Sequence, residues 1–225
     1  MLEVLYEDNH LIAINKRSGD IVQGDITGDS PLSDFVKTYI KKKYNKPGKV
    51  FLGTIRRLDR PTSGIVLFAR TSKALSRMNE QFKNKEVQKT YWAIVDKPPA
   101  SNSGTLDNFL QKNEKRNKSY ITKELKGKKA ILEYRLLKKL DKFYHLEIKP
   151  KTGRHHQIRV QLSNIGCVIK GDLKYGAKRS NKDASIHLLA RKIKFIHPVT
   201  KQDTTIIAPT PKDNIWDACI KSLDK

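Results

Sequence analysis

The amino-acid sequence predicts an α+β fold built around a largely antiparallel β-sheet. Short β-prone runs recur at hairpin spacing, a few segments carry apolar residues at helical spacing, and neither an internal repeat nor a heptad pattern occurs. The chain has 225 residues, of which 37% are hydrophobic, which is enough for a buried core. We expect a single domain over residues 1–225.

The first elements are expected in the order strand, strand, helix. Residues 2–6 and 10–15 are β-prone runs separated by a turn, and a loop rich in Gly, Asp and Ser follows. From Leu32 to about Tyr44, apolar residues recur at helical spacing while lysines fall largely elsewhere, which predicts an amphipathic helix with a basic side. The apolar positions of this helix are Leu32, Phe35, Val36, Tyr39 and Ile40.

The middle of the chain is expected to form a strand, a helix and a strand. Residues 64–70 are a compact apolar run typical of a buried strand, and Thr71 is suited to cap a helix that begins after it. Residues 86–95 return to a strand pattern, in which Tyr91 and Trp92 must face opposite sides. Residues 97–129 are polar and basic, and they predict a strand-and-loop insertion.

The last third is expected to form two hairpins with a short helix between them. Residues 130–140 and 143–150 predict an antiparallel pair, and residues 186–209 predict two strands around a proline-containing turn. The stretch 153–166 predicts a helix that starts at Gly153 and ends at Gly166, with Ile158, Leu162 and Ile165 in the core.

The charge of the chain indicates a polyanionic partner. It has 46 Lys and Arg against 23 Asp and Glu, a formal net charge of +23. A solubility bias alone requires less, so we favour nucleic acid as the partner. The two cysteines and six histidines show no metal-ligand spacing, so no metal or disulfide framework is expected. No leader pattern or apolar run of about 20 residues occurs, so we expect a cytoplasmic protein without a membrane segment.

The stretch "RRLDRPTSG" places Asp59 among Arg56, Arg57 and Arg60, directly before a turn. Nearby guanidinium groups favour the ionised carboxylate, so Asp59 could act as a nucleophile or base toward an anionic ligand that the arginines attract. The alternative is an aspartate that only fixes a loop by pairing with an arginine. Pro61 and the Thr-Ser-Gly that follows place the acid on a constrained loop at a strand edge, which favours the functional reading.

A second cluster of hydrogen-bond donors lies in "KTGRHHQIR". Arg154, His156 and Arg159 surround the expected helix start, where backbone amides and cations could together hold phosphates. Adjacent histidines on a helix point about 100° apart, which disfavours a metal site at His155 and His156. The alternative is a solvated basic face.

These segments together closely resemble the RluA family of RNA pseudouridine synthases. The matching stretches include "RRLDRPTSGIVLFAR", "KTYWAIV", "KTGRHHQIRVQLSNIGCVIKGDLKYG" and "HLLARKIKFIHPVT", in the order of the family, over most of residues 2–210. The resemblance implies the pseudouridine-synthase fold, a mixed sheet with flanking helices and loops around a central RNA-binding cleft. It also implies isomerisation of uridine in ribosomal or transfer RNA, without metal or organic cofactor.

The resemblance assigns roles to individual residues. It implies that Asp59 is the reacting carboxylate, which either attacks the ribose or takes a ribose proton. It implies that Arg57 helps to extrude the target nucleotide and that Tyr91 stacks on the uracil. It implies further that Ile158 lines the base pocket and that Arg159 pairs with the catalytic aspartate. Arg60, Arg154 and His156 are candidates for contacts to the RNA.

We expect no S4 domain, which many relatives carry before the catalytic domain, because the resemblance to the catalytic domain starts at residue 2. Two residues depart from the family pattern. Arg56 replaces the usual histidine and His155 the usual threonine, which could shift substrate choice. We expect a monomer. Two other functions remain open: a non-catalytic RNA-binding or assembly factor, and a glycosidase, which the single candidate carboxylate disfavours.

Overall fold

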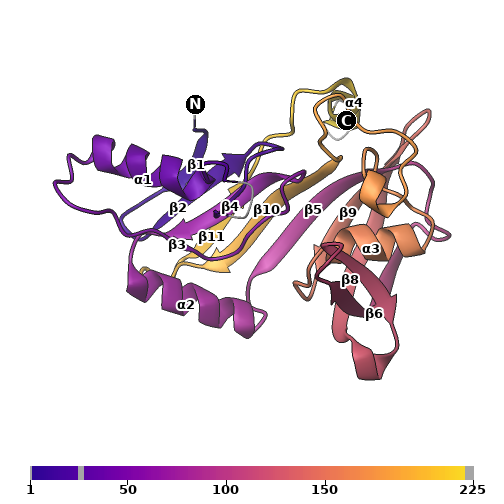
Figure 1. Cartoon of the computed structure of the whole chain (residues 1–225), viewed down its shortest axis with the longest axis horizontal. Coiled ribbons are helices and arrows are strands. Elements are labelled where there is room, and N and C mark those ends of the chain that lie inside the picture. Colours follow the sequence, from indigo (N-terminus) through magenta and orange to yellow (C-terminus); the bar gives the residue numbers. More distant parts are fainter. Residues whose placement is uncertain (1, 25–27, 221–225) are drawn as a thin grey trace. The chain divides into compact units, whose positions relative to one another are not determined.

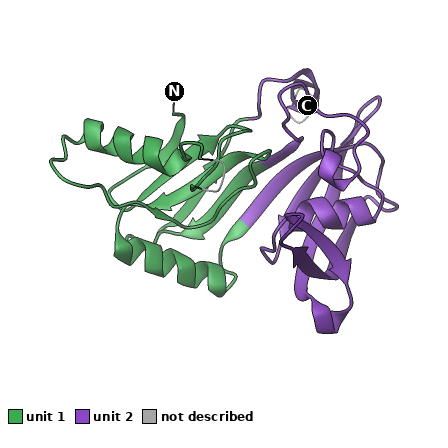
Figure 2. Cartoon of the chain, in the orientation of Figure 1, with its two compact units in different colours: residues 1–88, 190–209 green, residues 89–189, 210–225 purple. Residues whose placement is uncertain are grey.

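The chain folds into two compact units in the computed structural model, which describes residues 2–24 and 28–220. Unit 1 comprises residues 1–88 and 190–209, and unit 2 comprises residues 89–189 and 210–225 (Figure 2). Each unit is described by itself below. The expectation of a single catalytic domain stays a prediction.

Unit 1 is a β-sheet with two helices (Figure 1). Within it the strands follow the order β1-β2-β4-β10, β3 pairs with β4, and β11 pairs with β10. The β1–β2, β2–β4, β3–β4 and β10–β11 pairs are antiparallel, which confirms both hairpins expected from the sequence. The elements are β1 (Val4–Glu7), β2 (Leu11–Lys16), α1 (Leu32–Lys43), β3 (Gly53–Thr54), β4 (Ser63–Ala69), α2 (Ser72–Lys83), β10 (Leu188–Ile196) and β11 (Asp203–Ile207).

The predicted amphipathic helix forms as α1 and packs on one face of this sheet. Val36 and Ile40 are buried in a cluster with alternate residues of β2 and β4, among them Ile14 and Phe68. Phe35 was expected among the apolar contacts, but it is 55% exposed. It lies about 100° around the helix from Val36, and the buried stripe of α1 is too narrow to include it.

Helix α2 begins where the sequence predicts, at a threonine cap. The Thr71 hydroxyl accepts a hydrogen bond from the Ala74 amide at 3.2 Å, which satisfies one of the unpaired amides of the first turn. Met78 is fully buried, and Leu75 packs so closely on β3 that a side chain at Gly53 would collide with it.

Unit 2 is a second antiparallel array with strand order β5-β9-β8-β6-β7. The basic region 97–129 forms the β6–β7 hairpin and the start of β8, so the predicted strand-and-loop is confirmed. The expected turn at Asp141 joins β8 to β9. The elements are β5 (Gln88–Val95), β6 (Ser103–Asn113), β7 (Lys118–Thr122), η1 (Glu124–Lys126), β8 (Lys128–Lys139), β9 (Tyr144–Pro150), α3 (Gln157–Asn164), η2 (Leu173–Tyr175) and α4 (Asn214–Ile220).

Helix α3 covers part of this sheet but starts later than predicted. It begins at Gln157 instead of Gly153, because His156 has φ +54°, a left-handed conformation that a right-handed helix cannot contain. The Gln157 side chain stabilises the turn before the helix: its Oε1 accepts from the Arg154 amide at 3.0 Å and its Nε2 donates to the Ile131 carbonyl at 3.0 Å. Gly166, with φ +78°, follows the helix as expected, whereas Ile165 is 36% exposed and outside the core.

No helix in residues 2–24 and 28–220 is long and apolar enough to cross a membrane. In the same part of the chain, no group of three His, Cys, Asp or Glu side chains is arranged to hold a metal ion.

Candidate active site

Asp59 lies in unit 1, on the loop between β3 and β4. Its side chain is half-buried, and its carbonyl accepts a hydrogen bond from the Thr62 amide at 3.0 Å. Gly64, the second residue of β4, has φ +108°, and a Cβ there would lie 2.4 Å from the Ala190 carbonyl oxygen. Only glycine fits this close approach to β10, so the backbone that follows Asp59 is fixed.

The three arginines around Asp59 have different surroundings. Arg60 forms an exposed ion pair with Asp29 at 2.7 Å. Arg56 donates to the Ile55 carbonyl at 2.9 Å, and its guanidinium lies 4.6 Å from the centre of the Phe82 ring. Arg57 is exposed, as a residue that contacts a large ligand must be.

A buried lysine beside this loop was missed by the sequence analysis. Lys16 is only 1% exposed, and its Nζ donates to the carbonyls of Arg17 at 2.8 Å and Arg60 at 3.0 Å. Burial lowers its pKa to about 8, while the negative charges of Asp20 and Asp59 oppose that shift. Lys16 therefore fixes the backbone next to Asp59 and adds positive charge near it. Its position at the end of the unbroken apolar run 11–14 is the one signal that could have found it.

Arg159 lies in unit 2, on α3, and forms a buried two-pronged ion pair with Asp172. Its Nε donates to one carboxylate oxygen and its Nη2 to the other, both at 2.7 Å. The side chains are 5% and 1% exposed. Sequence reasoning did not single out Asp172, and the expected pairing of Arg159 with Asp59 stays a prediction.

Tyr175 contacts both Arg159 and His156. The Arg159 guanidinium lies 5.1 Å from the centre of the Tyr175 ring. The Tyr175 hydroxyl is 2.9 Å from His156 Nδ1 and accepts a hydrogen bond from the Ser119 amide at 2.9 Å. The expected 100° separation of His155 and His156 is wrong: because both precede α3, their rings stack with centres 3.8 Å apart.

His156 is held neutral, and this predicts a pH dependence of stability. Burial, followed by the charges of Arg159 and other nearby cations, lowers its pKa from 6.5 to about 2. The unfolded chain therefore binds a proton below pH 6.5 that the folded chain does not, so stability falls as the pH falls. Between pH 6 and 5 the free energy of unfolding of the wild type should fall by about 1 kcal/mol more than that of His156→Asn. Asparagine lacks the titrating group and tolerates positive φ.

Urea unfolding at pH 5, 6 and 7 measures this difference. His187, whose pKa is also lowered, chiefly by burial, is present in both proteins and so cancels from the comparison. Parallel pH profiles for the wild type and His156→Asn would contradict the prediction.

Tyr91 and Ile158 belong to the same hydrophobic cluster of unit 2. Ile158 is buried in it, and Tyr91, on β5, packs against it while remaining partly exposed. Trp92 faces the other side of β5, where it contacts His145 edge to face at 4.7 Å. The strand alternation expected from the sequence is confirmed, and Tyr91 is the aromatic residue on the side of Ile158.

The predicted site residues thus fall into two groups, one in each unit. Asp59, Arg57 and Arg60 lie on one loop of unit 1. Unit 2 holds the others, of which Arg154 is exposed and donates to the Lys129 carbonyl at 2.8 Å. The unit 2 residues are Tyr91, Arg154, His156, Ile158 and Arg159. Their roles toward a substrate stay predictions.

Comparison with known proteins identifies the class to which this fold and these residues belong. Residues 10–164 match the family model described as RNA pseudouridylate synthase. Two human structures share the fold. RNA Pseudouridylate Synthase Domain Containing 4 matches with a TM-score of 0.79 and 23% identity, over 99% of this chain and 93% of that one. RNA Pseudouridylate Synthase Domain Containing 1 matches with a TM-score of 0.74 and 22% identity, over 97% of this chain and 87% of that one.

Three curated relatives are more similar in sequence. The chain is 33% identical to tRNA pseudouridine synthase C of Vibrio vulnificus, over 100% of this chain and 96% of that protein. It is 32% identical to ribosomal large subunit pseudouridine synthase C of Buchnera aphidicola, over 98% of this chain and 70% of that protein. It is 34% identical to ribosomal large subunit pseudouridine synthase D of Borreliella burgdorferi, over 78% of this chain and 55% of that protein, so it spans about half the length of that relative.

The chain therefore belongs to the RNA pseudouridylate synthase family, whose members are RNA isomerases. The resemblance to the RluA type is confirmed.

Proposed function

We propose that this enzyme converts uridine in ribosomal or transfer RNA to pseudouridine, with Asp59 as the reacting group. The observation that carries this proposal is the Asp59 loop: a half-buried carboxylate on a fixed backbone, with Lys16 and three arginines nearby. Such surroundings attract an RNA phosphate.

The chemistry requires no net oxidation or reduction. The bond between N1 of the uracil and C1′ of the ribose breaks, and a bond from C5 to C1′ forms. The hydrogen of C5 leaves as a proton and N1 takes up a proton, so the product is an isomer of the uridine. Asp59 starts the reaction by attacking the ribose or by removing a ribose proton.

The other site residues are assigned to exposing and holding the nucleotide. A uridine within folded RNA must leave its stack before its glycosidic bond can react. Arg57 assists this extrusion, Tyr91 stacks on the uracil, and Ile158 supplies an apolar wall. Arg159 pairs with Asp59, while Arg60, Arg154 and His156 contact the RNA. The enzyme acts as a cytoplasmic monomer.

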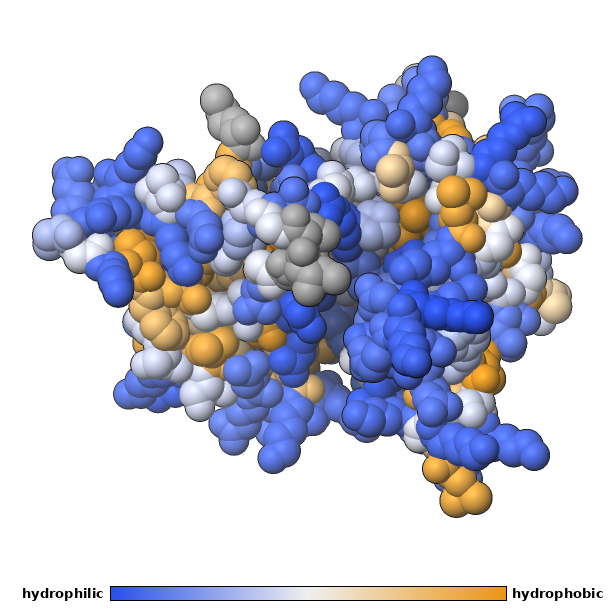
Figure 3. Space-filling model, in the orientation of Figure 1, coloured by the Kyte–Doolittle hydropathy of each residue, from blue (hydrophilic) through white to orange (hydrophobic). Residues whose placement is uncertain are grey.

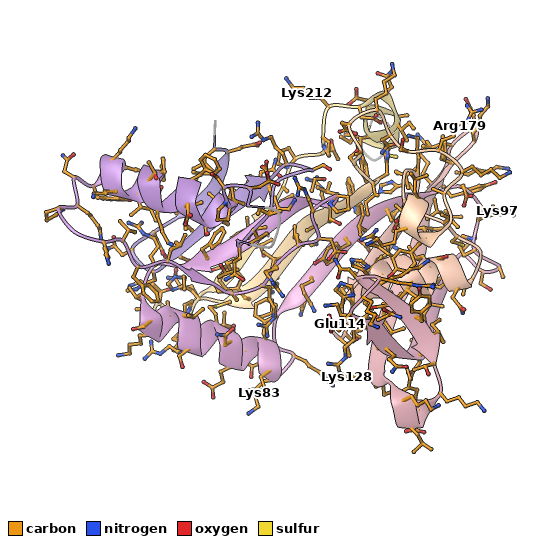
Figure 4. The ribbon with its side chains drawn as sticks, viewed as in Figure 1. Lys83, Lys97, Glu114, Lys128, Arg179 and Lys212 are labelled. Atoms are coloured by element: carbon orange, nitrogen blue, oxygen red, sulfur yellow. The ribbon has the colours of Figure 1, made fainter. Side chains whose placement is uncertain are left out.

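In unit 2, the β6–β7 hairpin is the surface that we assign to the binding of RNA phosphates. Hydrophilic side chains are dense on the visible face of this unit (Figure 3). Glu114, labelled in Figure 4, lies in the hairpin turn, and its carboxylate pairs with Lys112 at 2.6 Å. Exposed cations lie in the same turn and in the segment between the end of β7 and Lys128, which is also labelled. These cations are Lys115, Arg116, Lys123 and Lys126.

Removing hairpin cations should weaken RNA binding without changing the chemical step. In the triple variant Lys115→Ala/Arg116→Ala/Lys123→Ala, we expect KM to rise and kcat to stay within about twofold, because phosphate contacts position the RNA. The slope of log Kd against log salt should fall by about 2, since each lost contact to single-stranded RNA contributes about 0.7.

A variant with the same change in charge elsewhere serves as the control. Lys97, Lys139 and Lys142 are exposed in unit 2, outside the hairpin. Their triple replacement by alanine should leave the salt slope closer to that of the wild type. Equal slopes for the two triple variants would contradict a specific role of the hairpin.

Release of tritium from RNA that contains 5-tritiated uridine tests the proposed function. The wild-type protein should release tritium from ribosomal or transfer RNA and leave pseudouridine in the digested product. A non-catalytic RNA-binding factor would bind the RNA without release. A glycosidase would produce free uracil and an abasic ribose. Either result would overturn the proposal.

A further inference from the structure

The Asp172 carboxylate fixes the orientation of the Arg159 guanidinium. Asp172 accepts from Nε and Nη2 through its two oxygens, both at 2.7 Å. A two-pronged contact of this kind fixes both the position and the plane of a guanidinium, which one hydrogen bond does not.

Asp172 is itself held by its backbone. Its amide donates to the Ile169 carbonyl at 3.0 Å, and its carbonyl accepts from the amides of Tyr175 and Ala177, both at 3.0 Å. Gly171, just before it, has φ +87°, and a Cβ there would lie 2.6 Å from the Ser185 carbonyl oxygen. The turn therefore accepts no side chain at position 171, and it presents Asp172 at one place.

A second contact, with the Tyr175 ring, restricts one face of the Arg159 guanidinium. The Tyr175 ring lies 5.1 Å from the guanidinium carbon, and its hydroxyl is fixed by Ser119 and His156. With one edge bound by Asp172 and one face against Tyr175, the guanidinium of Arg159 is held in one orientation.

We propose that Asp172 is a positioning residue of the isomerisation: it fixes the orientation in which the Arg159 guanidinium acts in the reaction. The proposal rests on the proposed role of Arg159 toward Asp59. A purely structural pair is the alternative. Buried ion pairs add little net stability compared with apolar residues of similar volume, so stability alone is a weak reason for this pair.

Kinetics of two Asp172 variants test the proposal. Asp172→Asn removes the charge and replaces one acceptor by a donor, whereas Asp172→Glu keeps the charge but displaces the carboxylate. We expect kcat for tritium release to fall about 10- to 100-fold in both, since small misplacements of a catalytic group have effects of this size. KM for RNA should stay within about twofold. Circular dichroism identifies a temperature at which each variant is folded, and Asp172→Glu carries the test if Asp172→Asn does not fold.

A double-variant cycle separates positioning from a general effect on the fold. If Asp172 acts through Arg159, adding Asp172→Asn or Asp172→Glu to Arg159→Lys should lower kcat no further. The control is Glu7→Gln, which breaks another buried carboxylate–arginine pair, in unit 1, where Glu7 and Arg70 are 3.2 Å apart and 9% and 7% exposed. This control should be less stable than the wild type with unchanged kcat.

The possible outcomes are distinct. A wild-type kcat in folded Asp172→Glu, or a further loss of kcat in the double variant equal to that in the single one, would overturn the inference alone. Absence of tritium release by the wild-type protein would overturn the proposed function, and the inference with it.

Discussion

Replacing Asp59 by asparagine or alanine should reduce tritium release at least about 10³-fold, the order found when a reacting side chain is removed from an enzyme. Asparagine has nearly the shape of aspartate but is neither a nucleophile nor a base. The carboxylate is half-buried, and the loop is held by its backbone through Thr62, Gly64 and Lys16. The variants should therefore fold, and they should bind RNA because the surrounding cations remain.

Tritium release and filter binding on the same RNA measure the two properties separately. Asp34→Asn, a change of the same kind at an exposed residue of α1, is the control and should keep full activity. Equal rates of release from the wild type and Asp59→Asn would remove Asp59 from the mechanism. Loss of RNA binding together with activity would instead point to a role in binding.

Local sequence signals predicted most of the secondary structure. Helix α1 follows from apolar residues at helical spacing, and α2 from Thr71, whose hydroxyl caps the helix as expected. The β8–β9 and β10–β11 hairpins follow from paired β-prone runs with a turn between them. These signals act over a few residues, so the sequence alone contains them.

Contacts between distant segments could not be predicted in this way. The start of α3 depends on the Gln157 side chain, which accepts a hydrogen bond from the Thr152 hydroxyl and donates one to the Ile131 carbonyl, 26 residues away. The buried Lys16 Nζ donates a hydrogen bond to the carbonyl of Arg60, which lies 44 residues later. Asp172 follows Arg159 by 13 residues, beyond the reach of any helical or strand periodicity.

The site residues show the same division. The family resemblance singled out Asp59, Tyr91 and Arg159, but not the residues that hold them. Lys16 and Asp172 are charged residues that are almost completely buried, at 1% exposure each. A sequence does not reveal which of its many charges are buried, and that property distinguishes these two from the exposed lysines and aspartates.

Replacing Arg159 by methionine should reduce both activity and stability. Methionine fills a similar volume without charge, so the Asp172 carboxylate would remain buried with no guanidinium to pair with. Removing one partner of a buried ion pair lowers the free energy of unfolding by about 3–5 kcal/mol. Urea unfolding would show this loss as a lower midpoint. Tritium release should also fall, because the proposed partner of Asp59 is gone.

The double variant Arg159→Met/Asp172→Leu separates these two losses. Both charges are replaced by apolar side chains of similar volume, a change that leaves many buried pairs neutral or more stable, so most of the lost stability should return. Activity should not return, because a repaired core supplies no guanidinium to the reacting centre. Recovery of both stability and activity would show that Arg159 supports only the fold. Recovery of stability alone would show that the Arg159 guanidinium takes part in the reaction.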